Sequence, residues 1–188
     1  GYLLTPVIIC TGDDTYSYEV ITYAGEKTSV VAEAEALVRE WWGDDSTFRV
    51  PEIVWVDIIS GNIRGFQDVG YLFLDPDTSR DDLLATTVHE WIHELVDPGT
   101  LIDLEVEGEA YGRPVMEMVV ESITIDILGD MVEIAPAGVY EYFERTPELW
   151  NHRSELQEAY KNQEGFSAYE RILGENYLQI IHKAYSVW

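Results

Sequence analysis

The sequence predicts a soluble α+β protein, and three observations lead to that prediction. The first 75 residues mix strand-like and helix-like patterns, whereas the chain from Ser79 onward is helical almost throughout. Aromatic residues make up 12% of the chain and are spread along its whole length, which excludes an intrinsically disordered protein. No apolar run approaches the roughly 20 residues that a membrane-spanning helix requires.

The N-terminal elements predict a small, mostly antiparallel sheet covered by one helix. The helix is expected over residues 26–42, where apolar residues recur at helical spacing and Gly43 suits a C-terminal cap. Short apolar and β-branched runs bounded by Gly, Pro and Asp predict the strands. The expected strands span residues 3–10, 16–23, 51–59 and 69–74.

The rest of the chain predicts helices. Ser79 with Asp82 three residues later forms an acidic variant of the capping box, so a helix should begin there and end near Val96. Four further helices are expected over residues 114–128, 137–145, 147–161 and 166–185. The aromatic residues of the last three fall mostly at helical spacing, which favours core packing over a binding groove.

The charge of the chain excludes whole classes of partner. Thirty-six acidic residues against 11 basic ones give a net charge of −25, so the surface repels nucleic-acid phosphates and anionic membranes. Many carboxylates with only three lysines are typical of proteins from a salt-rich cytoplasm, and an ordinary acidic protein is the alternative. We therefore expect no nucleic-acid or membrane partner.

The N-terminal region bears on redox chemistry and location. Cys10 is the only cysteine, which excludes an internal disulfide and a cysteine-based zinc site, and its apolar neighbours predict a buried side chain. The first residues lack the charged and apolar segments of a signal peptide, so a cytoplasmic location is expected.

One motif dominates the sequence, His89-Glu90-Trp91-Ile92-His93, with the pattern H-E-x-x-H. Residues four apart lie on the same face of a helix, so both imidazoles can bind one metal ion. Glu90 is adjacent to the first ligand and can act as a general base on a metal-bound water. The alternative is a pair of helical histidines on an acidic surface.

A catalytic zinc ion needs a third protein ligand. The metzincin pattern is excluded because Val96 and Gly99 stand where it requires Gly and His. Glu117 and Glu121 share one face of an otherwise apolar helix, where a carboxylate is costly to bury unless it is paired or metal-bound. The carboxylates near the motif are Asp103, Glu105, Glu107, Glu109, Glu117 and Glu121.

With this second helix, the chain resembles the gluzincin branch of zinc metallopeptidases. It is most similar to small prokaryotic and phage-encoded zincins of the ImmA/IrrE and antirestriction-associated kind, over about residues 50–130. That resemblance implies one Zn²⁺ ion bound by His89, His93 and Glu121, which lies 28 positions after His93. The pattern of larger, thermolysin-like gluzincins implies instead Glu117 as the ligand, with Glu121 orienting a ligating histidine. Asp103 is a third candidate.

The resemblance implies one zincin-like domain and a peptidase activity. The domain would span residues 1–188, with the sheet and its covering helix in 1–78, the metal-binding helices in 79–130 and further helices in 131–188. The sheet would also pack on the helix that carries the H-E-x-x-H motif. Glu90 would be the general base, and the strand at residues 70–74 would be the sheet edge that pairs with a peptide or protein substrate. The candidates for stabilising an oxyanion are Tyr111, Tyr140, Tyr142, His152 and His182.

Two other functions remain open from the sequence. The first is a metal-binding but non-proteolytic protein, such as a regulatory, virion or antirestriction component on a zincin scaffold. The second is an acidic structural domain that binds no metal.

Overall fold

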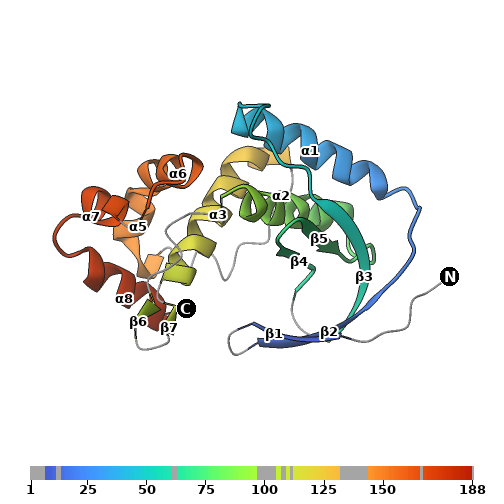
Figure 1. Ribbon diagram of the computed structural model, residues 1–188, viewed down its shortest axis with the longest axis horizontal. Helices are drawn as coiled ribbons and strands as arrows, with labels where there is room; N and C mark the ends of the chain where they lie inside the picture. The colour runs from blue at the N-terminus through green and yellow to red at the C-terminus, as the bar shows by residue number, and fades with distance from the viewer. Residues whose placement is uncertain are drawn as a thin grey trace. The chain divides into compact units, whose positions relative to one another are not determined.

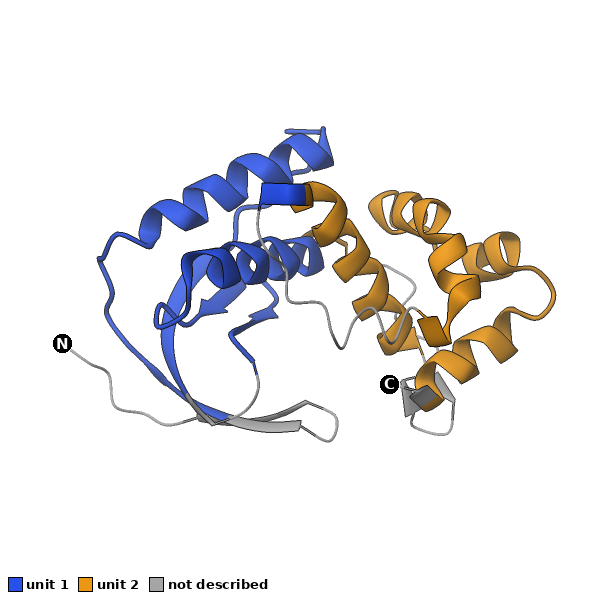
Figure 2. Ribbon diagram, turned by 180° about the vertical axis from the view of Figure 1, so that it is seen from behind, with its two compact units in different colours: residues 1–94, 130–134 blue, residues 95–129, 135–188 orange. Residues whose placement is uncertain are grey.

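The chain folds as an α+β protein, as the sequence predicts (Figure 1). The computed structural model describes residues 7–11, 14–60, 63–96, 105–106, 109–110, 112–131, 144–165 and 167–187. The chain forms two compact units, coloured separately in Figure 2. Unit 1 comprises residues 1–94 and 130–134, and unit 2 comprises residues 95–129 and 135–188.

Unit 1 contains a five-stranded sheet with the strand order β1-β2-β3-β5-β4. Its strands are β1 (Val7–Thr11), β2 (Asp14–Val20), β3 (Glu52–Ser60), β4 (Gly65–Asp68) and β5 (Tyr71–Leu74). Only the β3–β5 pair is parallel, so the expectation of a mostly antiparallel sheet is confirmed. The sequence analysis missed β4, a four-residue strand that turns at Gly70 into β5.

Helices α1 (Thr28–Trp42) and α2 (Arg80–Val96) lie on the same side of this sheet within unit 1 (Figure 1). Helix α1 buries one face, formed by residues at a spacing of four: Val30, Ala34, Val38 and Trp42. Gly43 caps it as expected, with a φ of 79° and its N–H 3.0 Å from the Arg39 carbonyl oxygen. The sheet therefore packs against the expected covering helix and against the motif helix, as the sequence predicts (Figure 1).

The sheet also carries an aromatic cluster. The rings of Phe66 and Phe73 stack with their centroids 4.4 Å apart, and Tyr18 lies 5.1 Å from Phe66. Leu72 and Leu74, which alternate with Phe73 along β5, are completely buried. The alternation of β5 therefore assigns its leucines and its aromatic residues to opposite faces of the sheet.

Unit 2 is mainly helical. Its elements are the hairpin β6 (Glu105–Val106) and β7 (Glu109–Ala110) and the helices α3 (Gly112–Leu128), α5 (Pro147–Asn151), α6 (Arg153–Lys161), α7 (Ser167–Leu173) and α8 (Tyr177–Val187). Helix α3 contacts α6 and α8. A short 3₁₀ turn, Gly129–Met131, follows α3.

Two of the long helices that the sequence predicts are each divided in two. The helix expected over residues 147–161 is interrupted at His152, and the one expected over 166–185 is interrupted at Gly174, which has a φ of 85°. A positive φ cannot continue a right-handed helix. Most of the helix expected over 137–145 lies outside the described residues. Within the described ranges, no helix has both the length and the apolar character needed to cross a membrane.

Candidate metal centre

Helix α2, which carries the H-E-x-x-H motif, begins as the sequence predicts. The Ser79 hydroxyl accepts a hydrogen bond from the Asp82 N–H at 3.1 Å, and the Ser79 carbonyl accepts one from the Leu83 N–H at 2.9 Å. Asp81 and Asp82 lie in the first turn, where carboxylates interact favourably with the helix dipole. This cap sets the residue at which the helix starts, and so the positions of the motif residues along it.

The loop before α2 is held by a buried carboxylate. Asp75 is 8% exposed, and its side chain accepts hydrogen bonds from the Ile58 N–H at 3.0 Å and the Asp77 N–H at 2.8 Å. From α1, the Lys27 ammonium donates to the carbonyl oxygens of Pro76, at 2.6 Å, and Thr78. These bonds satisfy the buried Asp75 carboxylate and connect the start of α2 to β3 and α1.

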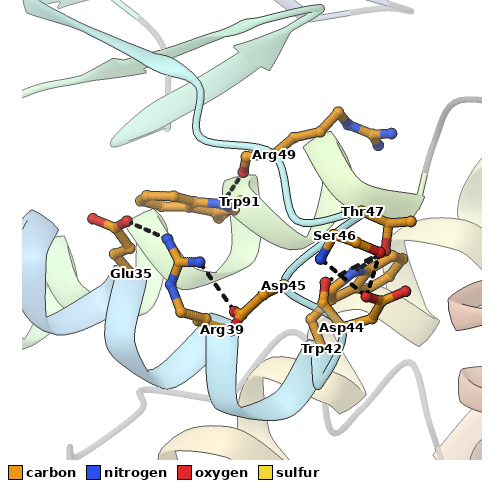
Figure 3. A network of polar contacts seen from close by, with 9 residues as sticks. All are labelled: Glu35, Arg39, Trp42, Asp44, Asp45, Ser46, Thr47, Arg49 and Trp91. Carbon is orange, nitrogen blue, oxygen red and sulfur yellow. Dashed lines mark hydrogen bonds and ion pairs between the residues drawn. The ribbon is translucent and has the colours of Figure 1, made fainter.

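The far half of α2 is buried on all sides. Every residue from 91 to 96 is buried, and the Trp91 indole N–H donates to the Arg49 carbonyl at 3.0 Å. Phe48 stacks on Trp91 at 5.9 Å, and the Arg39 guanidinium lies 4.2 Å from the Phe48 ring centroid. Figure 3 shows Trp91 beside the segment that follows α1. Such contacts restrict rotation of α2 about its own axis, which keeps the motif face in place.

The two motif histidines meet on consecutive turns of α2. Their Nε2 atoms lie 3.1 Å apart, and His93 is only 4% exposed whereas His89 is half-buried. Two nitrogen ligands of a tetrahedral zinc ion, each about 2.0–2.1 Å from it, lie about 3.3–3.4 Å apart. The pair therefore fits a shared metal ion, and a hydrogen bond between the rings is the alternative at this distance.

A carboxylate completes a group that could hold a metal ion. Among the described residues, His89, His93 and Glu117 each offer a ligand atom within 4.8 Å of the others. Glu117, the alternative that the sequence left open, belongs to this group, and Glu121, the residue that the sequence favoured, does not. Both are half-buried on α3, among largely buried neighbours.

Of the other candidates, His152 and His182 have described side chains and do not belong to this group. Glu105 and Glu109 lie in β6 and β7, whereas Asp103 and Glu107 lie outside the described residues. His152 lies 3.2 Å from a Glu155 carboxylate oxygen, and His182 is exposed on α8. The tyrosines considered for an oxyanion, Tyr111, Tyr140 and Tyr142, lie outside the described residues.

Strand β5 does not have the place that the resemblance implied. Residues 71–74 pair with β3 on one side and β4 on the other, so β5 is internal to the sheet. The two strands at the ends of the described sheet are β1 and β4, and β4 is the one beside β5. The edge was misassigned because no strand was expected between residues 59 and 69, where β4 lies.

Sequence reasoning also missed Glu94, which follows the second histidine. Glu94 is 3% exposed, and its carboxylate accepts hydrogen bonds from the Gln67 side chain and the Gly70 N–H. The usable signal was an acidic residue inside the apolar run that ends α2, because such a residue needs hydrogen-bond partners.

Comparisons of the chain with protein-family models, with curated proteins and with solved structures find no match.

Proposed function

We propose that the protein is a zinc metallopeptidase of the gluzincin type. The observation that carries this proposal is the 3.1 Å separation of the His89 and His93 Nε2 atoms on one face of α2. The presence of Glu117 in the same group supports it, because two imidazoles and one carboxylate leave the fourth position of a tetrahedral ion open.

The donor atoms favour zinc over other common metal ions. Imidazole nitrogen suits zinc, whereas magnesium and calcium prefer an all-oxygen site. Bound there, zinc would polarise the scissile carbonyl and lower the pKa of a coordinated water.

Glu90 would supply the acid–base chemistry. It directly follows His89 in α2 and is half-buried, so its carboxylate is neither fully solvated nor enclosed in the core. In the proposed reaction Glu90 accepts a proton from the attacking water and delivers it to the amine nitrogen of the leaving group. A glutamine at this position would have the same size but no basic carboxylate.

The substrate would be an extended peptide. In the described part of the sheet, β4 has one side paired with β5 and forms one of the two edges, the one whose neighbour β5 leads into α2. An edge strand presents backbone N–H and C=O groups with which an extended chain can pair, independently of the substrate's side chains. We propose that β4 binds the substrate backbone, in place of the residue 70–74 strand that the sequence suggested.

The test combines metal analysis with one substitution. The purified protein should hold about one equivalent of zinc, and Glu90→Gln should retain that zinc while peptide hydrolysis falls by at least about 100-fold, the lower range for loss of a general base. Glu40→Gln, an exposed glutamate on α1, is the matched control and should hydrolyse at the parental rate. Bound zinc without hydrolysis in the parent would favour the non-proteolytic metal protein. Zinc below a tenth of an equivalent after reconstitution would refute the metal site itself.

A further inference from the structure

We propose that Glu94 is a positioning residue that holds the edge strand β4 in register with the general base on α2. The inference rests on the proposed peptidase activity, because it concerns how the substrate-binding strand is placed. It assigns a role to the one carboxylate of the motif helix that is buried, yet is neither the proposed base nor a member of the metal group.

Both oxygens of the Glu94 carboxylate accept hydrogen bonds from the β4–β5 hairpin. The Gly70 N–H lies 3.0 Å from one carboxylate oxygen and 3.1 Å from the other, and the Gln67 side-chain amide donates at 2.6 Å. Gln67 belongs to β4, and Gly70 occupies the turn with a φ of 83°, a conformation that favours glycine. Hydrogen bonds to a buried charged acceptor are among the stronger ones in proteins.

The same hairpin lies directly against α2 at a second point. A Cβ atom on Gly65 would lie 2.7 Å from the Phe73 carbonyl oxygen and 2.9 Å from the Thr86 side chain. Glycine at this position therefore lets the start of β4 approach the helix closely. Two contacts fix β4 along α2. Gly65 lies beside Thr86, and Gln67 lies beside Glu94.

Glu94 itself is held firmly on the helix side. Its backbone carbonyl accepts a hydrogen bond from the Arg49 guanidinium, and the turn that contains it is buried. Because this turn of α2 is held in place, the Glu94 carboxylate also holds in place the residues that it binds, Gln67 and Gly70. The hairpin therefore depends on the last turn of α2 for its placement.

The spacing along the helix relates this anchor to the chemistry. Glu90 and Glu94 are four residues apart, so they lie one above the other on the same face of α2. Because Glu94 binds β4, this strand runs along the side of α2 that carries Glu90, the proposed base. Displacing the strand by 1 Å would misplace the scissile bond, an error that can cost about 100-fold in rate.

The experiment compares three variants by two readouts. Glu94→Gln keeps the size of the side chain and removes its charge, whereas Gln67→Leu removes one donor from β4 and leaves every atom of α2 in place. Asp75→Asn is the matched control, since the Asp75 carboxylate is also buried and accepts two backbone hydrogen bonds, but its donors, Ile58 and Asp77, belong neither to β4 nor to its turn. The first readout is hydrogen exchange of the Gly70 amide. The second is the ratio of kcat/KM for a peptide of about eight residues to kcat/KM for a blocked dipeptide. The zinc content of every variant is measured as well.

A positioning role predicts a specific pattern. Glu94→Gln and Gln67→Leu should both retain zinc and should lower the preference for the long peptide over the dipeptide, the ratio of their kcat/KM values, at least tenfold. Glu94→Gln should also speed hydrogen exchange of the Gly70 amide at least tenfold. Asp75→Asn should leave both the preference and the Gly70 exchange within twofold of the parent. If the parent is active and both variants keep its preference, or if Asp75→Asn changes it equally, the positioning role is refuted and the proposed function stands. If the zinc-loaded parent cleaves no peptide, the proposed function and this inference both fail.

Discussion

The hydroxyl groups of Tyr160 and Tyr169 lie 2.7 Å apart in the interior of unit 2, where both side chains are completely buried. Burial penalises the phenolate and raises the pKa of Tyr169 far above its usual value, while the hydrogen bond with Tyr160 opposes that shift more weakly. The pair joins α6 to α7 through a polar contact inside an apolar core.

This pair predicts a loss of stability at alkaline pH. Above about pH 10 the unfolded state loses the Tyr169 proton while the native state keeps it, so the free energy of unfolding falls by up to about 1.4 kcal/mol per pH unit. Tyr169→Phe should cost about 1 kcal/mol at neutral pH, from the lost hydrogen bond, and show a shallower decline above pH 10. Urea unfolding from pH 7 to 11 measures both effects. Tyr71→Phe, at an exposed tyrosine, should decline as the parent does, and an unchanged slope in Tyr169→Phe would contradict the assignment.

The elements that the sequence predicted correctly were those with a local signal. Helix α2 begins at a cap that Ser79 and Asp82 encode directly, and α1 ends at Gly43, whose positive φ is a local property of glycine. The missed strand β4 is four residues long, too short for its alternation to stand out, and it is fixed by β5 and by Glu94, far away in sequence. Long-range partners decide such short elements.

Replacing a motif histidine should abolish tight zinc binding. His93→Ala removes a buried residue proposed as a ligand, so the zinc affinity should fall by more than the roughly 10–100-fold that loss of a supporting residue costs. Competition with a chromogenic chelator measures the affinity. The exposed His182, changed to Ala, serves as the control and should leave the affinity unchanged. Equal affinities in the two variants would mean that the metal binds elsewhere.

The two glutamates of α3 should behave differently when replaced. Glu117→Ala should lower zinc affinity and, because metal binding is linked to folding, should also remove the rise in melting temperature that zinc produces in the parent. Glu121→Ala should retain zinc with an affinity at most about 10–100-fold weaker, as expected of a residue that supports a ligand. Thermal melts with and without zinc report the difference. The reverse order would reinstate Glu121 as the ligand.

The candidate site was only partly readable from the sequence. The spacing of His89 and His93 sufficed for the metal pair, because a four-residue step on a helix is a local geometric rule. The choice between Glu117 and Glu121 could not be made from the sequence, because both lie on one face of α3 and only the tertiary arrangement distinguishes them. The sequence could mark Glu94 as an acidic residue in an apolar run, but its partners Gln67 and Gly70 could not be predicted, since they precede it by more than 20 residues.

Salt should stabilise the protein strongly. The net charge of −25 causes self-repulsion in the compact state, and counter-ions screen it over a Debye length that falls from about 10 Å at 0.1 M to about 3 Å at 1 M salt. The melting temperature should therefore rise steadily between about 0.1 and 1 M KCl. Sucrose at matched osmolality controls for general exclusion effects. A melting temperature that does not change with KCl would argue against adaptation to salt.

The close approach of β4 to α2 can be tested at Gly65. A methyl group there would overlap the Phe73 carbonyl oxygen, which belongs to the paired strand and cannot rotate away, as well as the Thr86 side chain. Overpacking of this kind typically costs about 1–3 kcal/mol, so Gly65→Ala should lower the urea midpoint correspondingly. Gly165→Ala is the control, because a Cβ atom there meets open space, and its stability should stay within about 1 kcal/mol of the parent. If Gly65→Ala is as stable as Gly165→Ala, the strand does not lie against the helix, and the anchoring argued for Glu94 loses its second point of contact.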